Sequence, residues 1–392
     1  MKSTLNLTPN PGPETPLYLH EDWRSGPAVP GAVIQAIDTP ALLLELDPFE
    51  RNMAVVHSAI AARGKRIRAH VKAHKTTAIA LRQIAAGAHS ICCQKASEAE
   101  VFIDAGLADV LITNQIVGAA KCARVARMAA RAKVGVCVDH PLQVTQMGEA
   151  ARAAGSCVDV LIEVDIGHGR CGVSDAAQVL ELARAISAYP GHLSLQGIHA
   201  FRGSAQHMRL PGERDAAVAA AVVQLRALVA MLEKHGFACP VITGGGTGTY
   251  LLEALSDIYT EVQPGSYVLM DIDYATNTPD VNAPVLQHAL TVLCSVISER
   301  PQHAVLDGGL KTFAVDQGLP RILTPGWRVK SLSDEHTIIT ADPGTPALGL
   351  GTRVQLLPGH CDPTVNLHDW IVAVRGGVVQ EVWPVDARGA LF

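Results

Sequence analysis

The sequence is poor in aromatic residues and has no excess of positive charge. Phe, Tyr and Trp make up 4% of its 392 residues, and the formal net charge is -5 at pH 7. Proteins that bind nucleic acid use stacked aromatic rings, a surplus of Lys and Arg, or both. The composition therefore argues against a nucleic-acid partner and favours a small molecule.

Long apolar runs and paired cysteines are also missing. The longest Ala-rich run, from Ala216 to Leu232, is interrupted by Gln224 and Arg226, so we expect no membrane-spanning segment. Residues 1–37 lack the continuous apolar stretch of a secretory signal. The nine cysteines are scattered without a CxxC pair, which is typical of reduced thiols. We expect a cytoplasmic protein.

The chain does contain enough apolar residues for a large core. Hydrophobic residues make up 48% and charged residues 18%, with a mean hydropathy of +0.20. Burial of so much apolar surface can offset the conformational entropy lost on folding, which excludes a disordered chain. At roughly 150 residues per domain, the length indicates two or three domains, or a barrel with a smaller companion.

Between residues 41 and 265, short β-rich runs alternate with longer Ala-rich runs of helical period. After a first strand at Ala41–Leu46, Asp47 is predicted to cap a helix, with Pro48 at its first position and Glu50 completing a capping box. Eight further strands are predicted at Arg66–Val71, Ser90–Gln94, Asp109–Asn114, Lys133–Asp139, Val158–Asp165, Leu193–Phe201, Pro240–Gly244 and Tyr259–Gln263. Eight β/α repeats in roughly 200 to 250 residues are typical of a (β/α)8 barrel, a TIM-type α/β fold; an open doubly wound sheet is the alternative.

From about residue 280 the pattern changes to strands without helices between them. These are predicted at Ala289–Ile297, Ala304–Asp307, Val329–Ser331, His336–Thr340, Arg353–Leu357 and Trp370–Val382, the last with a hairpin turn at Gly376-Gly377. We therefore expect a leader at 1–37, a barrel at 38–275 and a separate C-terminal β domain at 276–392. The sequence leaves open whether the leader and the Ala41 strand join the β domain.

Candidate functional residues follow five of the predicted barrel strands, where barrels carry their sites. Lys72 lies between His70 and His74 after the first. A lysine whose pKa is lowered by desolvation can form a Schiff base, although a surface lysine beside solvated histidines is the more common case. His207, after the sixth, is either a general base or a solvated loop histidine.

Glycine-rich loops follow three of these strands. Gly244–Gly248 and Gly265–Tyr267 offer bare amides and hydroxyls for one phosphate group, beyond what tight turns need, but no GKS/T ending of a nucleotide-binding P-loop. Gly167–Gly172 matches GxGxxG formally. The following strand lacks the acidic residue that would hold a ribose, which argues against a nicotinamide dehydrogenase. Arg170 in this loop is either a fixed cation or an ordinary loop residue.

A possible metal pair occurs in the β domain at His360-Cys361-Asp362, where a strand is predicted to end. Alternate residues of a strand point the same way, so His360 and Asp362 would face one ion while Cys361 faces away. One imidazole and one carboxylate suit Mg²⁺ or Mn²⁺ better than a closed zinc site. The motif alone is a weak signal.

Taken in order, these segments resemble the D-threonine aldolase and D-serine dehydratase family of pyridoxal-phosphate enzymes. That family is built on the alanine-racemase type of barrel plus β domain, known as fold type III. The resemblance extends from Asp38 to Gly389. Its most specific segments are His70–Lys75, Cys92–Lys95, Gly167–Gly172, Gly244–Gly248 and His360–Asp369.

The resemblance implies pyridoxal 5'-phosphate and a divalent metal ion, Mg²⁺ or Mn²⁺, as cofactors, and a homodimer. Lys72 would hold the pyridoxal phosphate covalently, with Arg170 near its phenolic oxygen and Gln263 near its ring nitrogen. A neutral amide there would leave that nitrogen unprotonated. Other cofactor contacts would come from Phe201, Gly245, Gly246, Thr247, Gly265, Ser266 and Tyr267. His207 would be the base at the substrate hydroxyl, and His360 and Asp362 the metal ligands.

The metal pair favours one activity within the family. Aldolase members resemble His-x-Asp at this position and dehydratase members His-x-Cys with zinc, so the chain is expected to cleave D-3-hydroxy-α-amino acids to glycine and an aldehyde. The alternatives are β-elimination by a dehydratase and a non-catalytic pyridoxal-phosphate carrier, a class that lacks the β domain.

Two departures from the family pattern concern the substrate. Phe201 stands where aldolases tend to have Tyr, and Arg202 replaces a usually uncharged residue. Arg202 either meets a substrate carboxylate, which would suit 3-hydroxyaspartate, or faces solvent.

Overall fold

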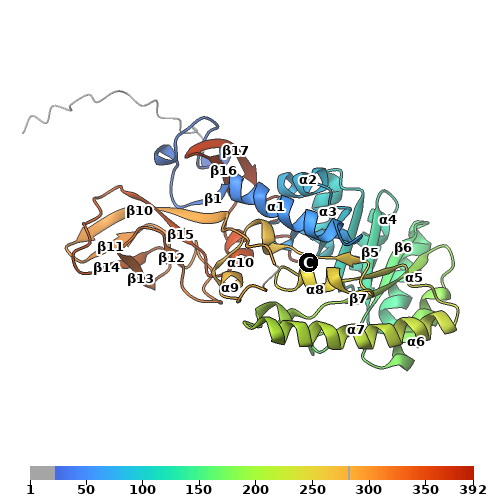
Figure 1. Cartoon of the computed structure of the whole chain (residues 1–392). Helices are drawn as coiled ribbons and strands as arrows, with labels where there is room; N and C mark the ends of the chain where they lie inside the picture. Colours follow the sequence, from blue (N-terminus) through green and yellow to red (C-terminus); the bar gives the residue numbers. More distant parts are fainter. Residues whose placement is uncertain (1–22, 281–282) are drawn as a thin grey trace, which may run out of the picture.

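The computed structural model of the chain describes residues 23–280 and 283–392. These form a closed eight-stranded barrel beside a nine-stranded sheet (Figure 1). The closed barrel confirms the predicted (β/α)8 architecture with a separate C-terminal sheet, and it excludes the open doubly wound sheet. Residues 1–22 of the predicted leader lie outside the described residues.

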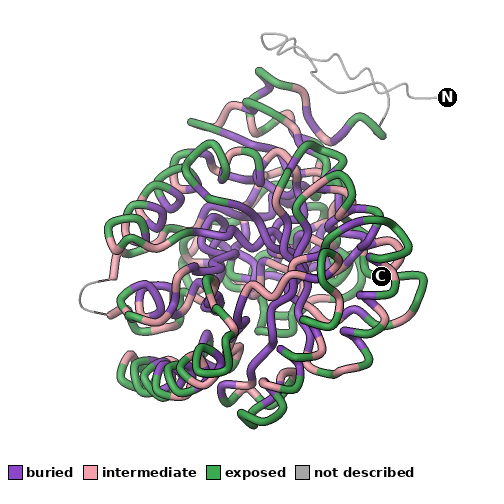
Figure 2. The backbone as a smooth tube through the Cα atoms, turned by 90° about the vertical axis from the view of Figure 1, so that its right-hand side faces the viewer, coloured by how far each residue is buried: buried purple, intermediate pink, exposed green. Residues whose placement is uncertain are grey.

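The barrel strands are parallel and follow one another around the ring in chain order. They are β2 Arg66–His70, β3 Ser90–Cys93, β4 Asp109–Gln115, β5 Lys133–Val138, β6 Val158–Glu163, β7 Leu193–Ala200, β8 Val241–Gly244 and β9 Glu261–Val262. Most of their residues are buried (Figure 2). The reason is that helices cover the outside of the barrel and side chains fill its inside. This is why they read in the sequence as short, nearly continuous apolar runs.

The outer helices are amphipathic segments between the strands. They are α1 Leu46–Ala61, α2 Thr77–Ala85, α3 Ala96–Asp104, α4 Ala119–Ala129, α5 Pro141–Ala154, α6 Ala176–Ser187, α7 Pro211–Lys234 and α8 Tyr250–Leu255. The predicted start of the first helix is wrong: α1 begins at Leu46, and Asp47 makes no cap. Asp47 and Glu50 instead pair with Arg375 of the sheet domain, a contact that local sequence cannot reveal.

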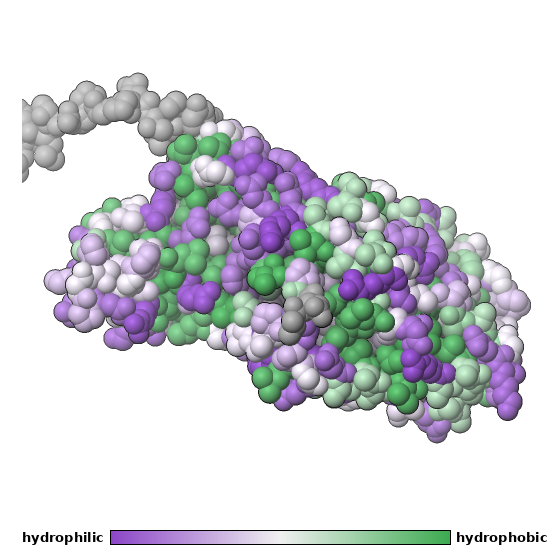
Figure 3. Space-filling model, viewed as in Figure 1, coloured by the Kyte–Doolittle hydropathy of each residue, from purple (hydrophilic) through white to green (hydrophobic). Residues whose placement is uncertain are grey.

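Helix α7 is the longest, at 24 residues, and its length and apolar composition would by themselves suffice to cross a membrane. In the structure it lies on the outside of the barrel, where apolar and polar residues are mixed on the surface (Figure 3). One of its faces is buried, and Val223 is exposed. The absence of a membrane-spanning segment therefore remains a prediction.

The second domain is a sheet whose longest strand, β10, has 11 residues. The sheet runs in the order β13-β14-β11-β10-β1-β16-β17, with β15 pairing β10 and β12. Its strands are β1 Ala41–Glu45, β10 Leu290–Arg300, β11 His303–Leu306, β12 Arg321–Ile322, β13 Trp327–Leu332, β14 Thr337–Ala341, β15 Arg353–Leu357, β16 Trp370–Arg375 and β17 Val378–Pro384. The two-residue β12 has no counterpart among the predicted strands. Gly376 and Gly377 both have positive φ, as the predicted hairpin turn requires.

The chain starts in the sheet, leaves it for the barrel and then returns. Strand β1 lies between β10, to which it is antiparallel, and β16, to which it is parallel. The described part of the leader packs on the same domain: Val33 bridges Val378, and Ala32 and Ile37 are buried. The chain therefore enters the barrel through α1 directly from the domain that it completes last.

A bulge in β7 sets which side chains of that strand enter the barrel. Consecutive residues Val160 and Leu161 of β6 pair with Leu195 and Gly197, so Gln196 is an extra residue. Gly197 has φ +138°, and a Cβ there would lie 2.0 Å from the carbonyl oxygen of Val241. Only glycine fits this close approach.

We expect Gly197→Ala to prevent stable folding, because the Cβ collides with backbone rather than with a movable side chain. The expected loss in the free energy of unfolding is about 4 kcal/mol or more. Gly191→Ala is the matched control: Gly191 also has positive φ but nothing lies within 4 Å of its Cβ position, so the loss should be about 1 kcal/mol. Denaturant unfolding of both variants tests this, and equal losses would contradict it.

Candidate active site

A cavity of about 510 Å³ opens at the carboxyl ends of the barrel strands. Most of its wall comes from the barrel, and two residues come from the sheet domain. The wall residues are His70, Lys72, Gln94, Thr113, His168, Arg170, His199, Phe201, Gly203, Ser204, Gln206, His207, Gln263, Tyr274, His360 and Asp362. The structure thus brings together seven residues that the sequence singled out, from segments up to 290 positions apart.

Lys72 lies directly after β2, in the short helix η3 Val71–Ala73. Its Nζ contacts a carboxylate oxygen of Asp362, whose other oxygen accepts a hydrogen bond from Ser266 at 3.0 Å. Burial alone would lower the pKa of Lys72, but the Asp362 charge outweighs burial and raises that pKa. The expectation of a lowered lysine pKa is therefore wrong for the chain without cofactor, and the pKa of Asp362 lies well below its usual range.

Neutral hydrogen-bonding groups cover the floor beside Lys72. The Gln94 amide nitrogen donates to His70 Nε2 at 3.0 Å and to Thr113 at 2.9 Å. Because His70 Nε2 accepts, Nδ1 carries the proton, and it has no partner among the described residues. Burial holds the pKa of His70 well below its usual range. The floor beside Lys72 therefore holds a neutral imidazole with an unpaired N–H donor.

The first glycine-rich loop packs against polar side chains. A Cβ on Gly246 would lie 2.6 Å from Gln206 Oε1, and the backbone N–H of Gly248 donates to that oxygen at 2.9 Å. The Thr247 hydroxyl is buried without a partner in the described part of the chain. Bare amides and an unpaired hydroxyl are the donors that a phosphate group needs.

The second loop places its residues differently. A Cβ on Gly265 would lie 2.8 Å from the His70 carbonyl oxygen, so this position is also confined to glycine. The Tyr267 hydroxyl bonds His57 at 2.7 Å and Gln83 at 3.1 Å in the protein core. Of the residues predicted here to contact the cofactor, Tyr267 therefore directs its side chain away from the cavity.

His207 ends the short helix η4 Gly203–His207 after β7 and is held by a buried carboxylate. Its Nδ1 lies 2.5 Å from Asp273 of α9 (Ile272–Ala275), and Arg209 contacts the other Asp273 oxygen. An ionised carboxylate accepts the Nδ1 proton, which leaves Nε2 as the basic nitrogen. The arrangement fits a general base whose ring orientation is fixed by Asp273 at Nδ1.

His360 and Asp362 do not lie on a strand, which corrects the expectation. His360 precedes the short helix α10 Cys361–Val365, and Asp362 lies in its first turn. His360 Nδ1 is 2.7 Å from Asp316, so Nε2 remains for a ligand. The Cys361 thiol is buried outside the cavity wall, and burial raises its pKa well above the usual range. A hard N and O donor pair thus faces the cavity, without a thiolate.

Backbone N–H groups of the Gly167–Gly172 loop donate hydrogen bonds within the protein. Asp165 accepts hydrogen bonds from the backbone N–H groups of Gly167, His168 and Gly169 at 2.8 to 3.1 Å. These groups are not free for a dinucleotide phosphate. Arg170 reaches the cavity wall, with its guanidinium 5.8 Å from the ring centre of Phe201.

Arg202 does not reach the cavity wall. Its guanidinium lies against Gly167 and its Nε is 3.4 Å from Ser204. Arg202 is half-buried beside Ser204 of the wall, so both alternatives for it stay predictions.

Pyridoxal phosphate and a metal ion both fit the residues present. Lys72 lines the cavity and suits an aldehyde-bearing ring, and His70 beside it has an Nδ1 without a partner among the described residues. Gly245, Gly246 and Thr247 lie outside this cavity wall, in the glycine-rich loop that would receive a phosphate group. His360 already gives Nδ1 to a carboxylate, which is how metal-binding histidines are usually held. With Asp362 it offers the imidazole and carboxylate that suit Mg²⁺ or Mn²⁺.

Sequence reasoning missed Asp273, Asp316 and Gln206, each of which positions a predicted residue or loop. Asp273 belongs to Met270-Asp271-Ile272-Asp273-Tyr274, which follows the eighth barrel strand; two acidic residues at that end of a barrel were an available signal. Asp316 lies in a loop of the sheet domain, 44 positions from His360. No local pattern connects the two.

Family models match both domains. The model for the alanine racemase N-terminal domain matches residues 44–273, and that for a putative serine dehydratase domain matches residues 289–374. The boundary between the matches falls between the barrel and the long strand β10.

Individual relatives are similar over nearly the whole chain. A D-threonine aldolase from Arthrobacter sp is 44% identical over 365 residues, which cover 93% of this chain and 96% of that protein. A 3-hydroxy-D-aspartate aldolase from Paracoccus denitrificans (strain Pd 1222) is 41% identical over 371 residues, covering 93% and 95%. The crystal structure of D-threonine aldolase from Filomicrobium marinum has a TM-score of 0.90 and 43% identity, covering 94% of this chain and all of that one.

Glu253 of α8 makes stability depend on pH. It is buried beneath Gly245, and burial raises its pKa from 4.5 to about 8. The folded state keeps a proton that the unfolded chain has released, so the free energy of unfolding falls as pH rises from 4.5 to 8, by about 3 to 5 kcal/mol. Glu253→Gln should remove this fall. Glu149→Gln, a change at an exposed residue, is the control and should keep the fall. Denaturant unfolding at pH 5 to 8 measures the free energy of unfolding of both variants. Parallel curves of this free energy against pH for Glu253→Gln and wild type would contradict the assignment.

Asp316 should control metal affinity through His360. Asp316→Ala frees the imidazole to rotate, and we expect Mn²⁺ to bind about 10- to 100-fold more weakly. Asp334→Ala, an exposed residue of the same domain, is the control. Calorimetric titration with Mn²⁺ measures this, and unchanged affinity in Asp316→Ala would place the ion elsewhere.

Proposed function

The chain belongs to the alanine racemase N-terminal domain family, among the D-threonine aldolases and their relatives, and from this we propose that it cleaves D-3-hydroxy-α-amino acids to glycine and an aldehyde. It is a carbon–carbon lyase that acts on small molecules. One observation supports the proposal above all: Lys72 and Asp362, which would hold the cofactor and the metal ion, are in contact and line one cavity with His207.

Pyridoxal phosphate is implied by the fold family. Lys72 would hold it covalently, Gly245, Gly246 and Thr247 would receive its phosphate, and Arg170 and Gln263 would face its ring. The chemistry supplied by this cofactor when bound is an electron sink for the pair released at Cα. Because Lys72 now pairs with Asp362, it must give up that partner when it takes the cofactor.

His360 and Asp362 would hold a divalent ion, Mg²⁺ or Mn²⁺. The chemistry supplied by the ion is that of a Lewis acid, which lowers the pKa of a hydroxyl bound to it. Since Cys361 is a buried thiol and Asp362 lines the cavity, the chain presents His-x-Asp rather than His-x-Cys to the site. This supports the aldolase over the dehydratase.

His207 would take the proton of the substrate 3-hydroxyl at Nε2. One Asp273 oxygen holds Nδ1 and the other contacts Arg209, so the imidazole is fixed in the tautomer that accepts at Nε2. The hydroxyl proton leaves the substrate as the Cα–Cβ bond breaks, and a proton returns to Cα to give glycine. The reaction therefore balances without water, oxidant or reductant.

The wider setting is also part of the proposal. All nine cysteines are free and six are buried, which supports a reducing compartment such as the cytoplasm. The alanine-racemase type of fold supports a homodimer. A non-catalytic carrier is disfavoured because the sheet domain contributes His360 and Asp362 to the cavity.

Product identification from D-threonine tests the activity directly. With pyridoxal phosphate and Mn²⁺ we expect acetaldehyde and glycine, whereas β-elimination would give 2-oxobutanoate and ammonia and would overturn the proposal.

His207→Ala should retain cofactor absorbance and lose about 10²- to 10⁴-fold in kcat. Chelation should abolish cleavage and Mn²⁺ should restore it. An enzyme indifferent to chelator would remove the metal from the proposal.

A further inference from the structure

Gln263 is the cavity end of a buried row of polar side chains that crosses the barrel interior. Arg68 Nε lies 2.7 Å from Glu261 Oε1, and the Thr243 hydroxyl lies 3.0 Å from the same oxygen. Gln263 Nε2 lies 2.8 Å from that hydroxyl, and His199 Nε2 lies 3.1 Å from Gln263 Oε1. All five residues are buried.

The direction of these hydrogen bonds follows from the charged end. The Arg68 guanidinium can only donate, and the Glu261 carboxylate that it pairs with can only accept. Thr243 must therefore donate its single hydroxyl proton to Glu261, and its oxygen must accept from Gln263. The amide nitrogen of Gln263 then faces Thr243, and its oxygen faces His199, whose Nε2 carries a proton.

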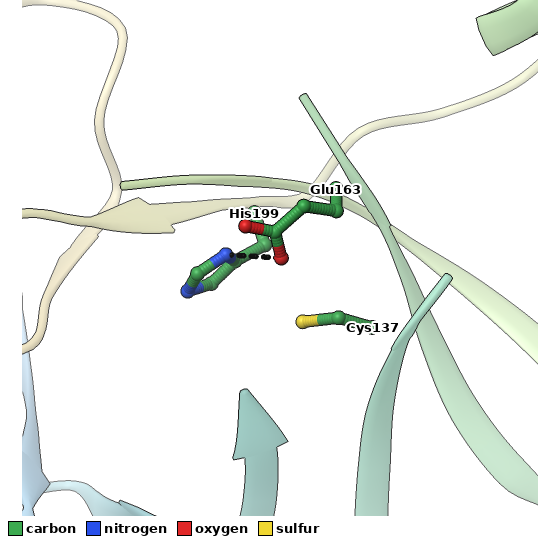
Figure 4. Close-up of side chains that lie close together, drawn as sticks. All are labelled: Cys137, Glu163 and His199. Carbon is green, nitrogen blue, oxygen red and sulfur yellow. Dashed lines mark ion pairs between the residues drawn. The ribbon is translucent and has the colours of Figure 1, made fainter. Parts of the chain in front are cut away.

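A second buried acid lies beside His199. Its Nδ1 lies 2.8 Å from Glu163 Oε2, next to the thiol of Cys137 (Figure 4). Burial alone would lower the pKa of His199, but the Glu163 charge outweighs burial and raises it. At each end of the row a basic side chain is paired with a carboxylate, and Thr243 and Gln263 are the neutral links between them.

A metal ion is the other interpretation of Cys137, Glu163 and His199, whose ligand atoms lie within 4.8 Å of one another. Two ligands on one tetrahedral ion, each about 2.0 to 2.1 Å from it, lie about 3.3 Å apart. The imidazole and carboxylate are closer than that, at 2.8 Å. His199 Nε2 is also committed to Gln263. The observations therefore favour an ion pair.

We propose that Arg68, Glu261 and Thr243 are positioning residues that fix the amide of Gln263 from inside the barrel. Gln263 gives one of its two N–H groups to Thr243, and the other has no partner in the described part of the chain. Resting on the proposed function, this amide would present a hydrogen-bond donor to the cofactor ring nitrogen. A nitrogen that accepts a hydrogen bond stays unprotonated, so residues that never touch the cofactor set its ionisation.

Thr243→Val tests the proposal, because it keeps the shape of the side chain and removes the hydroxyl that joins Glu261 to Gln263. Thr243 is not part of the cavity wall. We expect pyridoxal phosphate to bind about five- to tenfold more weakly than to the wild-type protein. We also expect its ring nitrogen to take up a proton at a higher pH than in the wild type. Thr243→Ser keeps the hydroxyl and should behave as wild type.

The readouts are independent of substrate. They are the absorption of bound pyridoxal phosphate across pH and the ¹⁵N chemical shift of ring-labelled cofactor, on protein checked for folding by its melting temperature. An unchanged shift and affinity in folded Thr243→Val would overturn the proposal. If that variant does not fold, Glu163→Gln, which removes the His199 partner at the other end, takes its place with the same expectation. A wild-type protein that binds no pyridoxal phosphate would instead refute the proposed function.

Metal analysis covers the other interpretation. In His360→Ala, which lacks the proposed ligand at the mouth, we expect no bound Zn²⁺ or Mn²⁺ after dialysis. One equivalent that remains in His360→Ala and is lost on adding Cys137→Ala would make the trio a metal site, and would overturn the hydrogen-bond direction at His199.

Discussion

The contact between Lys72 and Asp362 is the interaction on which the site depends. It joins the end of the first barrel strand to a short helix of the sheet domain, 290 positions later. The path of the chain makes it possible: β1 is held in the sheet between β10 and β16, so the barrel begins beside the domain that later supplies Asp362. Neither domain alone contains both a lysine and a metal pair at this cavity.

Both histidines predicted to act in the site are held in the same way. Asp273 holds Nδ1 of His207 and Asp316 holds Nδ1 of His360, so Nε2 of each ring is the nitrogen left for a ligand. One nitrogen is thereby suited to accept a proton and the other to bind a metal. The difference between the two roles comes from their neighbours, since Asp362 stands beside His360 and Arg209 stands behind Asp273.

Much of the fold could be predicted because its strands are buried on both faces and separated by helices of clear period. The strand β12 could not be predicted, because two residues are too few to show a pattern. The start of α1 could not be predicted either, because Asp47 pairs with Arg375 of a distant strand. Lys72, His207, His360 and Asp362 were predicted by motif, and all four line one cavity. Their partners Asp273 and Asp316 were not, because those contacts exist only in the folded chain. The pKa of Lys72 is raised rather than lowered, because the charge of Asp362 lies beside it only in the folded chain.

The central claim is that one cavity, shared by two domains, takes both a cofactor on Lys72 and a metal ion on His360 and Asp362. Anomalous diffraction at the manganese edge, from crystals grown with pyridoxal phosphate and Mn²⁺, tests this most directly. The account predicts a single anomalous peak within bonding distance of His360 Nε2 and an Asp362 oxygen, with continuous density from Lys72 Nζ to the cofactor. A peak elsewhere, such as at Cys137, or a cofactor not joined to Lys72, would contradict it.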